Sequence, residues 1–392
     1  TPGITTSGGT APLPARVSAP SIFNPITPFR VFDSRDGTGG GLTRPLNAGE
    51  RVRVLIAGVG DIPASGVTAV VANVTAHEAT QPNYFTVYPS RTARPGTSNL
   101  NAGPGRTVPN LVVMGVGSDG SIDVFNSHGT AHCIVDVFGY YTADAGDRFT
   151  PLRPRRLFDT RNGRGIRAGK IVHQTPVDVQ VAGEAGVPAS GATAVVLNVA
   201  VVEPESLGWV RVRPAGDTRG ATSNLNFRPG DIVPNLVICK LGDGGKITVD
   251  GYGPGTHVLG DVFGYFGESG SLLRTVAPKR MLDTRDGIGA EKRPVGPDHG
   301  ITLSIAGLST FPRDATAVVL NVTATNVTGP TYVTVWPDGT DMPSTSNLNV
   351  VTGQTTANLV ICRLGSTGAL QLASPIANCD LIADVLGYCI AD

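Results

Sequence analysis

The sequence is 392 residues long, and 16% of these are charged, with 31 basic residues balanced by 31 acidic ones. This neutrality argues against nucleic-acid binding and against a polybasic membrane surface. No apolar run approaches the roughly 20 residues that a spanning helix needs, so we expect no membrane insertion. The 51 Gly and 30 Pro, together with many Val and Thr, indicate a turn-rich β protein.

Residues 1–26 are rich in Thr, Gly, Pro, Ser and Ala and have little periodicity, which is typical of an extended arm or linker. Such an arm could lie along a neighbouring subunit or remain a free tail. The chain begins with Thr1 rather than Met. We read this as the mark of a removed secretory signal, which predicts a secreted, extracellular protein at the cell surface.

The motif Thr-Ser-Asn-Leu-Asn occurs three times, with its first Asn at Asn99, Asn224 and Asn347. The spacings are 125 and 123 residues, and an Asn-Leu-Val motif follows each copy. A period of this kind predicts one module repeated three times, each of about 120 residues and large enough to bury its own core. The expected modules are 27–149, 150–271 and 272–392.

Each module has a series of short β patterns. In the first, Phe29–Asp33 ends in a turn, Arg51–Ile56 alternates as a half-buried strand does, and Thr68–Ala76 suits a central strand. The Asp-Gly pair at Asp119 predicts a hairpin between the strands on either side of it. The last strand of the module closes at Tyr141.

About eight short strands in each copy predict an all-β fold of three tandem β-sandwich-like repeats. The junctions are short, so the copies should touch. They could close into a unit with pseudo-threefold symmetry or form a row. A six-bladed β-propeller with two blades per copy is the alternative, because eight strands divide into two groups of four.

Polar residues recur at matching places in the copies. Each copy has an Asp-x-Arg turn, four Asn and one late Asp; in the first copy two of the Asn are Asn73 and Asn110, and the late Asp is Asp136, Asp261 or Asp384. The candidate ligand-binding or structural set is Asp33, Arg35, Asn99, Asn101, Asp159, Arg161, Asn224, Asn226, Asp283, Arg285, Asn347 and Asn349.

This set has two interpretations. Carboxylate, guanidinium and amide groups suit sugar hydroxyls, which need paired donors and acceptors. The same groups also satisfy strand ends and pin loops, and we favour this structural interpretation because their neighbours are apolar. An Arg inside the acidic loop argues against calcium, so we expect no metal.

Nothing in the sequence predicts an enzyme. Among six His, only His132 and His257 match between copies, and no GxSxG, HExxH or phosphate-loop motif has a fitting context. We therefore expect no catalytic residue and no cofactor.

The five cysteines contain no CxxC pair, which disfavours zinc and thioredoxin-like chemistry. Cys239 and Cys362 occupy the same apolar place in their copies, which suits a buried thiol. A bridge among the last three is open to the chain, and the odd count leaves at least one thiol unpaired. The cysteines are Cys133, Cys239, Cys362, Cys379 and Cys389.

Together, these motifs resemble a triplicated repeat of secreted actinobacterial proteins, which often accompanies cell-wall amidases. The resemblance covers about residues 27–392 and is carried by Phe158–Arg161, Ala194–Val199, Thr222–Asn226 and Asp261–Phe266. It implies export and an envelope role, and no catalytic residue. The third copy departs from the pattern with Cys389 in place of an aromatic residue.

We therefore expect a non-enzymatic secreted surface protein that binds or attaches to the cell envelope, through glycan, with its repeated modules raising avidity. The alternative is a structural subunit of an extracellular filament, surface layer or virion. Such a subunit would assemble with copies of itself through its N-terminal arm and strand edges.

Overall fold

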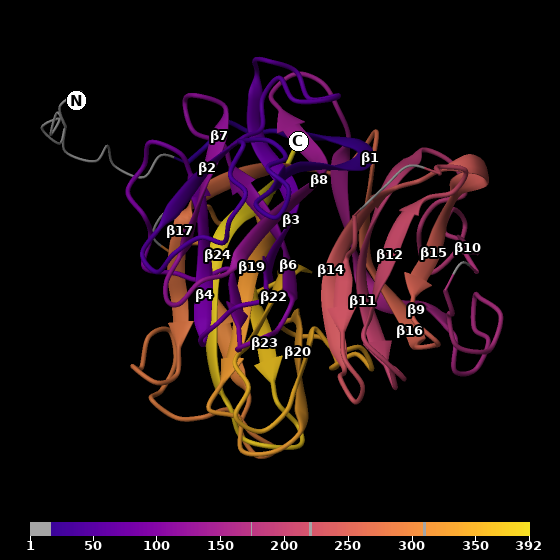
Figure 1. Cartoon of the computed structure of the whole chain (residues 1–392). Coiled ribbons are helices and arrows are strands. Elements are labelled where there is room, and N and C mark those ends of the chain that lie inside the picture. The colour runs from indigo at the N-terminus through magenta and orange to yellow at the C-terminus, as the bar shows by residue number, and fades with distance from the viewer. Residues whose placement is uncertain (1–16, 174, 219–221, 309–310) are drawn as a thin grey trace, which may run out of the picture.

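The β-rich composition becomes 24 strands and one 3-10 turn (η1, Asp243–Gly245) in a computed structural model that describes residues 17–173, 175–218, 222–308 and 311–392. Each repeat supplies eight strands (Figure 1). The first module contains β1 (Ile22–Asp33), β2 (Arg51–Leu55), β3 (Val67–His77), β4 (Asn83–Pro89), β5 (Leu100–Ala102), β6 (Val108–Gly115), β7 (Ser121–Asn126) and β8 (His132–Thr142).

The other two modules repeat this order. The second contains β9 (Arg148–Asp159), β10 (Val177–Gln180), β11 (Ala192–Val202), β12 (Gly208–Pro214), β13 (Leu225–Phe227), β14 (Val233–Lys240), β15 (Lys246–Tyr252) and β16 (His257–Gly267). The third contains β17 (Ser271–Asp283), β18 (Ile301–Ser304), β19 (Ala315–Thr325), β20 (Thr331–Pro337), β21 (Leu348–Val350), β22 (Thr356–Arg363), β23 (Ala369–Ala373) and β24 (Asp380–Ala391).

Each module is a sandwich of two antiparallel sheets. In the first module the inner sheet has the order β1-β8-β3-β6 and the outer sheet the order β2-β7-β4-β5. Strands that are neighbours in a sheet are mostly not consecutive in the chain, whereas propeller blades are built from four consecutive strands. The expectation of β-sandwich repeats is confirmed, and the propeller alternative is wrong.

The expected hairpin at Asp119 is also wrong. The turn at Asp119 connects β6 of the inner sheet to β7 of the outer sheet, and these two strands do not pair. A tight Asp-Gly turn can lead across a sandwich as readily as it can close a hairpin, so the turn residues alone do not decide the pairing.

The nearly continuous apolar runs are explained by burial on both faces of the inner sheet. In β11, Val195 and Leu197 pack in the second module's own core with Val210 of the outer sheet. The alternate residues, Ala194 and Val196, belong to a different cluster that all three modules share. Both faces of this strand are therefore dry, which removes the usual alternation with polar residues.

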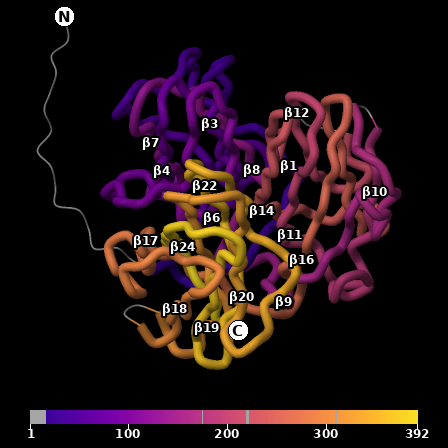
Figure 2. Tube along the Cα trace, turned by 90° about the horizontal axis from the view of Figure 1, so that it is seen from below, coloured from indigo at the N-terminus to yellow at the C-terminus, as the bar shows by residue number. Residues whose placement is uncertain are grey.

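The three modules surround a common axis (Figure 2). Their edge strands β6, β14 and β22 contact one another at the centre. The shared core takes equivalent side chains from each module. These are Val71, Val113, Phe138 and Tyr141 from the first, Val196, Ile238, Phe263 and Phe266 from the second, and Val319, Ile361, Leu386 and Cys389 from the third.

The ring of modules is closed by short backbone pairings at one end. The junctions pair Phe23 with Asp147 and Phe149 with Ser271. The last pairing joins Leu273 of the third module back to Ser21, which precedes the first strand. The unit is therefore closed with pseudo-threefold symmetry rather than arranged as a row. We call this the junction end, and the opposite end, which carries the β1–β2, β3–β4, β5–β6 and β7–β8 loops and their equivalents, the groove end.

The glycine of the Asp-Val-Phe-Gly-Tyr motif has a packing reason. A Cβ on Gly139 would clash with the ring of Phe23, and one on Gly264 would clash with the ring of Phe149. At both positions the first strand of the module lays its aromatic ring directly on the glycine backbone. The motif therefore records a close approach of two neighbouring strands.

The expected arm is ordered at its inner part. β1 begins at Ile22, inside the expected 1–26 segment, and Ser18 exchanges hydrogen bonds with the backbone of Thr275 in the third module. Val17 packs against that module's core. Residues 1–16, to which most of the arm prediction refers, lie outside the described residues.

All five cysteines are buried and free, so the bridge considered for the third module is not formed. Burial raises the pKa of the Cys362 and Cys389 thiols to about 12. Cys389 occupies the place of Tyr141 and Phe266 in the shared core, where it acts as a small apolar side chain. In the part of the chain that the structure describes, no helix is long and apolar enough to cross a membrane.

Candidate functional site

The Asp-x-Arg turn forms a compact cluster of ions. The carboxylate of Asp33 is fully buried and accepts hydrogen bonds from the Arg35 backbone N–H at 2.9 Å and from Arg35 Nη2 at 2.6 Å. Arg30 joins this carboxylate to the late Asp136, through bonds of 2.9 Å and 2.8 Å. Equivalent bonds connect Arg156 and Arg161 to Asp159, and Arg280 and Arg285 to Asp283.

The two carboxylates of a cluster have opposite pKa shifts. Burial opposes the ionisation of Asp33, but the hydrogen bonds and charge of Arg35 outweigh it and lower its pKa. At Asp283 the hydrogen bond from Arg285 is the largest cause, and the pKa is again lowered. Burial raises the pKa of Asp136, although the bonds from Arg30 oppose the rise. The Asp-x-Arg carboxylate is therefore the firmly ionised member, held within the turn.

The first Asn of each Thr-Ser-Asn-Leu-Asn motif is a buried brace inside its own module. Asn99 Oδ1 accepts a hydrogen bond from the Val87 backbone N–H at 2.7 Å. Asn224 does the same for Val212, and Asn347 for Val335, both at 2.7 Å. The side chain replaces a missing strand partner beside β4, β12 or β20, which is a structural role.

The Ser before that Asn makes a contact with the next module. Asn73 Nδ2 donates to the Ser223 carbonyl oxygen at 2.9 Å. Asn198 donates to Ser346 at 2.6 Å, and Asn321 donates to Ser98 at 2.8 Å. Each motif is thus seated on the inner sheet of a neighbouring module, and the three contacts run around the ring.

A second set of asparagines closes the centre. Asn110 Oδ1 accepts from the Leu359 N–H, Asn235 Oδ1 from Leu111, and Asn358 Oδ1 from Leu236, at 3.0 to 3.2 Å. Every one of these bonds crosses a module boundary, and together they form a closed cycle. Their amide nitrogens donate to Asn321, Asn73 and Asn198.

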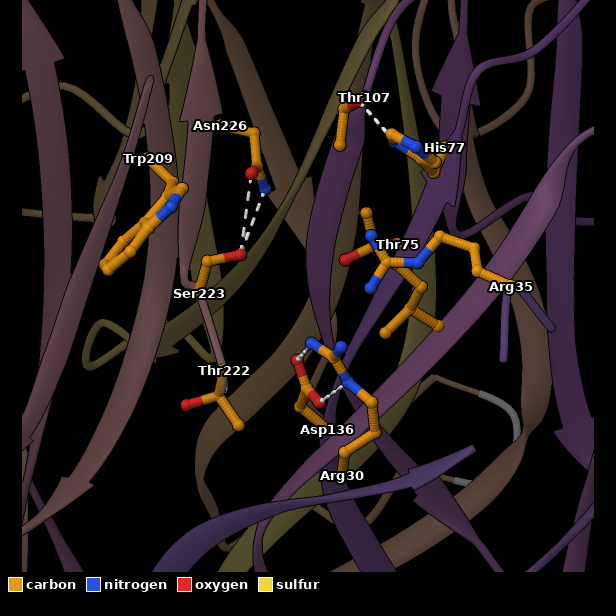
Figure 3. A pocket seen from close by; sticks show the side chains of 11 residues that line it. Arg30, Arg35, Thr75, His77, Thr107, Asp136, Trp209, Thr222, Ser223 and Asn226 are labelled. Carbon is orange, nitrogen blue, oxygen red and sulfur yellow. Dashed lines mark hydrogen bonds and ion pairs between the residues drawn. The ribbon is translucent and has the colours of Figure 1, made fainter. Parts of the chain in front are cut away.

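A cavity of about 320 Å³ lies at the groove end between the first and second modules (Figure 3). Arg35 reaches into it from the first module, facing Ser223 and Asn226 of the second. We call this cavity the first groove. Its lining is Arg30, Arg35, Thr75, His77, Thr107, Ile134, Asp136, Trp209, Thr222, Ser223 and Asn226.

The structure divides the predicted set. Arg35 and Asn226, which are far apart in the sequence, meet in the first groove, while Asp33 lies behind Arg35 and holds it. Asn224 is buried away from the groove lining, and its equivalents Asn99 and Asn347 are buried as well. Asn101 and Asn349 are the half-buried equivalents of Asn226 in the other modules.

Sequence reasoning missed part of the groove. Arg30 recurs as Arg156 and Arg280, always three residues before the Asp of the turn, so its recurrence could have revealed it. Trp209 and His77 are not repeated identically, and no sequence signal marks them. Among the described residues, no group of three or more His, Cys, Asp or Glu is placed to hold a metal ion.

No protein-family model matches the chain, and no curated protein matches it. The chain has weak similarity to solved structures of an archaeal virus. One, described as the triple jelly roll fold and turret assembly in an archaeal virus, is 10% identical over 98% of this chain and 99% of that chain, with a TM-score of 0.21. Another, the atomic structure of Sulfolobus Turreted Icosahedral Virus, is 9% identical over 96% and 90%, with a TM-score of 0.20. Scores this low carry no argument about what this chain does.

Proposed function

We propose that this chain is a non-enzymatic, extracellular structural subunit that assembles with copies of itself. The observation that carries the proposal is the distribution of exposed apolar side chains. Of nine large apolar residues exposed among the described residues, six lie at the groove end. They are Leu207, Ile232, Tyr252, Ile288, Val351 and Ile376.

These side chains are well exposed for their type. Leu207 is 65% exposed and Ile376 is 61% exposed, on the β11–β12 and β23–β24 loops. Apolar groups gathered on one end of a protein favour association, because contact with another surface removes them from water. The chain has no net charge at pH 7, so electrostatic repulsion between copies is weak.

The unit of three modules, which we call the block, is suited to this role because its recurrent polar residues act mainly within and between its own modules. The asparagine cycle joins the three sandwiches into one body, and each Asp–Arg cluster holds a turn within its own module. Ser18, in the described part of the expected arm, is hydrogen-bonded to Thr275 of the third module. A contact between the groove end of one copy and the junction end of the next would repeat without closing, as in a filament.

Light scattering and electron microscopy of the full chain test the proposal over a wide concentration range. We expect particles larger than one chain that grow with concentration. A Leu207→Asp/Ile376→Asp double variant should shift the population to monomer. Thr302→Asp, which changes an exposed residue in the middle of β18 and away from both ends, should leave assembly intact. A wild-type chain that stays monomeric at every concentration would contradict the proposal.

A further inference from the structure

We infer that the first groove binds one unit of a neutral saccharide, and that an equivalent groove between the third and first modules binds a second. This inference shares the groove end with the proposed assembly but does not rest on it, because the space lies between modules of one chain. The cavity volume of about 320 Å³ lies at the lower end of the range for small-molecule sites. That volume suits a sugar unit rather than a large cofactor.

The charges in the first groove are balanced. Arg35 is paired with Asp33, and Arg30 bridges Asp33 and Asp136. Burial lowers the pKa of His77, so its ring is neutral at pH 7. Two guanidinium groups facing two carboxylates leave no net field to select an anion, but they present fixed donors and acceptors. This suits an uncharged ligand with many hydroxyl groups.

Two donors in the first groove are available to such a ligand. Within the described residues, neither Arg35 Nη1 nor Trp209 Nε1 has a hydrogen-bond partner. In the described part of the chain, the Asn226 amide has only long hydrogen bonds with Ser223 Oγ, donating at 3.3 Å and accepting at 3.5 Å. The half-buried indole of Trp209 is steadied by the parallel ring of Tyr252 at 6.3 Å. A sugar ring could pack its C–H face on the indole and use the polar edge for hydroxyls.

Pseudo-symmetry places the same kind of groove at the other two boundaries, with Tyr332 or Tyr84 in place of Trp209. In the first groove, His77 and Thr107 share a 2.8 Å hydrogen bond, and we call this pair the polar mouth. The groove between the third and first modules keeps a polar mouth, because Thr325 and Thr355 occupy the same places and also share a 2.8 Å hydrogen bond. The groove between the second and third modules has Val202 and Ile232 at these places. It has lost the polar mouth and should not bind.

The boundary between the third and first modules carries counterparts of two residues of the first groove. Thr97 Oγ1 and Asn101 Nδ2 are buried and have no partner among the described residues. They are equivalent to Thr222 and Asn226, which line the first groove. Thr345 Oγ1, the counterpart at the boundary between the second and third modules, is also buried without a partner among the described residues, so the second site rests on the Thr325–Thr355 pair rather than on these atoms.

Titration calorimetry and intrinsic fluorescence with the neutral tetrasaccharides cellotetraose and tetra-N-acetylchitotetraose test the inference. We expect at least one of them to bind at two sites per chain and to perturb Trp fluorescence. Trp209→Ala and Asn226→Ala should each weaken the first site by about tenfold or more. Trp336→Ala, at the other tryptophan, and Tyr332→Ala, in the apolar groove, should leave binding unchanged.

Circular dichroism and melting of each variant separate lost binding from lost folding, and Asn226→Ala keeps the test valid if Trp209→Ala does not fold. Heparin serves as the anionic probe. Tighter binding of heparin than of the neutral sugars, or no binding of either tetrasaccharide at millimolar concentration, would overturn the inference. The Leu207→Asp/Ile376→Asp variant should bind sugar normally, which keeps this result apart from the assembly test.

Discussion

Asn235 Nδ2 donates a 2.9 Å hydrogen bond to Asn73 Oδ1, and this bond joins the second module to the first. The same Asn235 side chain accepts from the Leu111 N–H across the boundary and donates to the Asn224 carbonyl oxygen within its own module. One fully buried amide thus serves three partners on two modules. The Asn of the Asn-Leu-Val motif therefore links neighbouring modules.

Asn235→Ala should destabilise the whole block. It leaves Asn73 Oδ1, the Leu111 N–H and the Asn224 carbonyl buried without this partner, and we expect the free energy of unfolding to fall by roughly 3 kcal/mol. Chemical denaturation followed by circular dichroism measures this. Asn162→Ala is the matched control and should change little, because this exposed turn residue accepts a hydrogen bond from Arg164 N and has no other side-chain bond among the described residues. Equal effects of the two variants on the free energy of unfolding would contradict the role of Asn235 in linking the modules.

Asn224→Ala tests the brace inside a module. Its loss leaves the Val212 N–H unpaired in a dry core, so we expect a loss of roughly 1 to 3 kcal/mol, with sugar binding at the first groove retained. Thermal melting and a binding titration on the same sample separate these effects. Unchanged melting with lost binding would mean that Asn224 is a ligand residue instead.

Acid should weaken the block through the Asp-x-Arg turns. The pKa of Asp283 is lowered, chiefly by the hydrogen bond from Arg285, so its contribution to stability is present above the ordinary Asp pKa and is lost as pH falls through the lowered value. Burial raises the pKa of Asp384, so pH acts on this residue in the opposite direction. The stability that Asp384 contributes is present below the ordinary Asp pKa and is lost as pH rises through the raised value.

Carboxyl-carbon NMR titration checks these directions. Asp283 should titrate below 3.8 and Asp384 above it. Arg285→Gln should move the Asp283 titration to higher pH and start the acid loss of stability earlier. Arg44→Gln, which removes an exposed partner of Glu50, should not affect Asp283. An Asp283 that titrates at its ordinary value in the wild type would contradict the cluster.

The thiols should be inert in the folded protein. All five are buried and unpaired, and burial raises the pKa of Cys389 to about 12, so almost no thiolate is present at pH 8. A thiol reagent should label none of them quickly in buffer and all five in denaturant. Rapid labelling of even one folded-state thiol, or fewer than five after unfolding without reductant, would be the contrary result.

The sequence predicted the features that depend on local pattern. The recurring Asn224 motif gave the number of modules, and the long apolar run around Val196 gave a central strand. The structural role of Asn224 was also favoured, because an amide among apolar neighbours needs an internal partner.

The sequence could not predict which modules meet. Asn73 bonds to Ser223 rather than to Ser98 of its own module, and three copies that share this motif carry no signal for that choice. The first groove could not be predicted for the same reason, because Arg35 and Asn226 belong to different modules. The turn at Asp119 failed because turn chemistry does not say whether the next strand joins the same sheet.

Differential scanning calorimetry of the full chain tests most directly whether the three modules form one interlocked body. The account predicts a single transition whose calorimetric and van't Hoff enthalpies agree, and which Asn235→Ala shifts as a whole to lower temperature. Two or three separate transitions, of which Asn235→Ala moves only one, would contradict it.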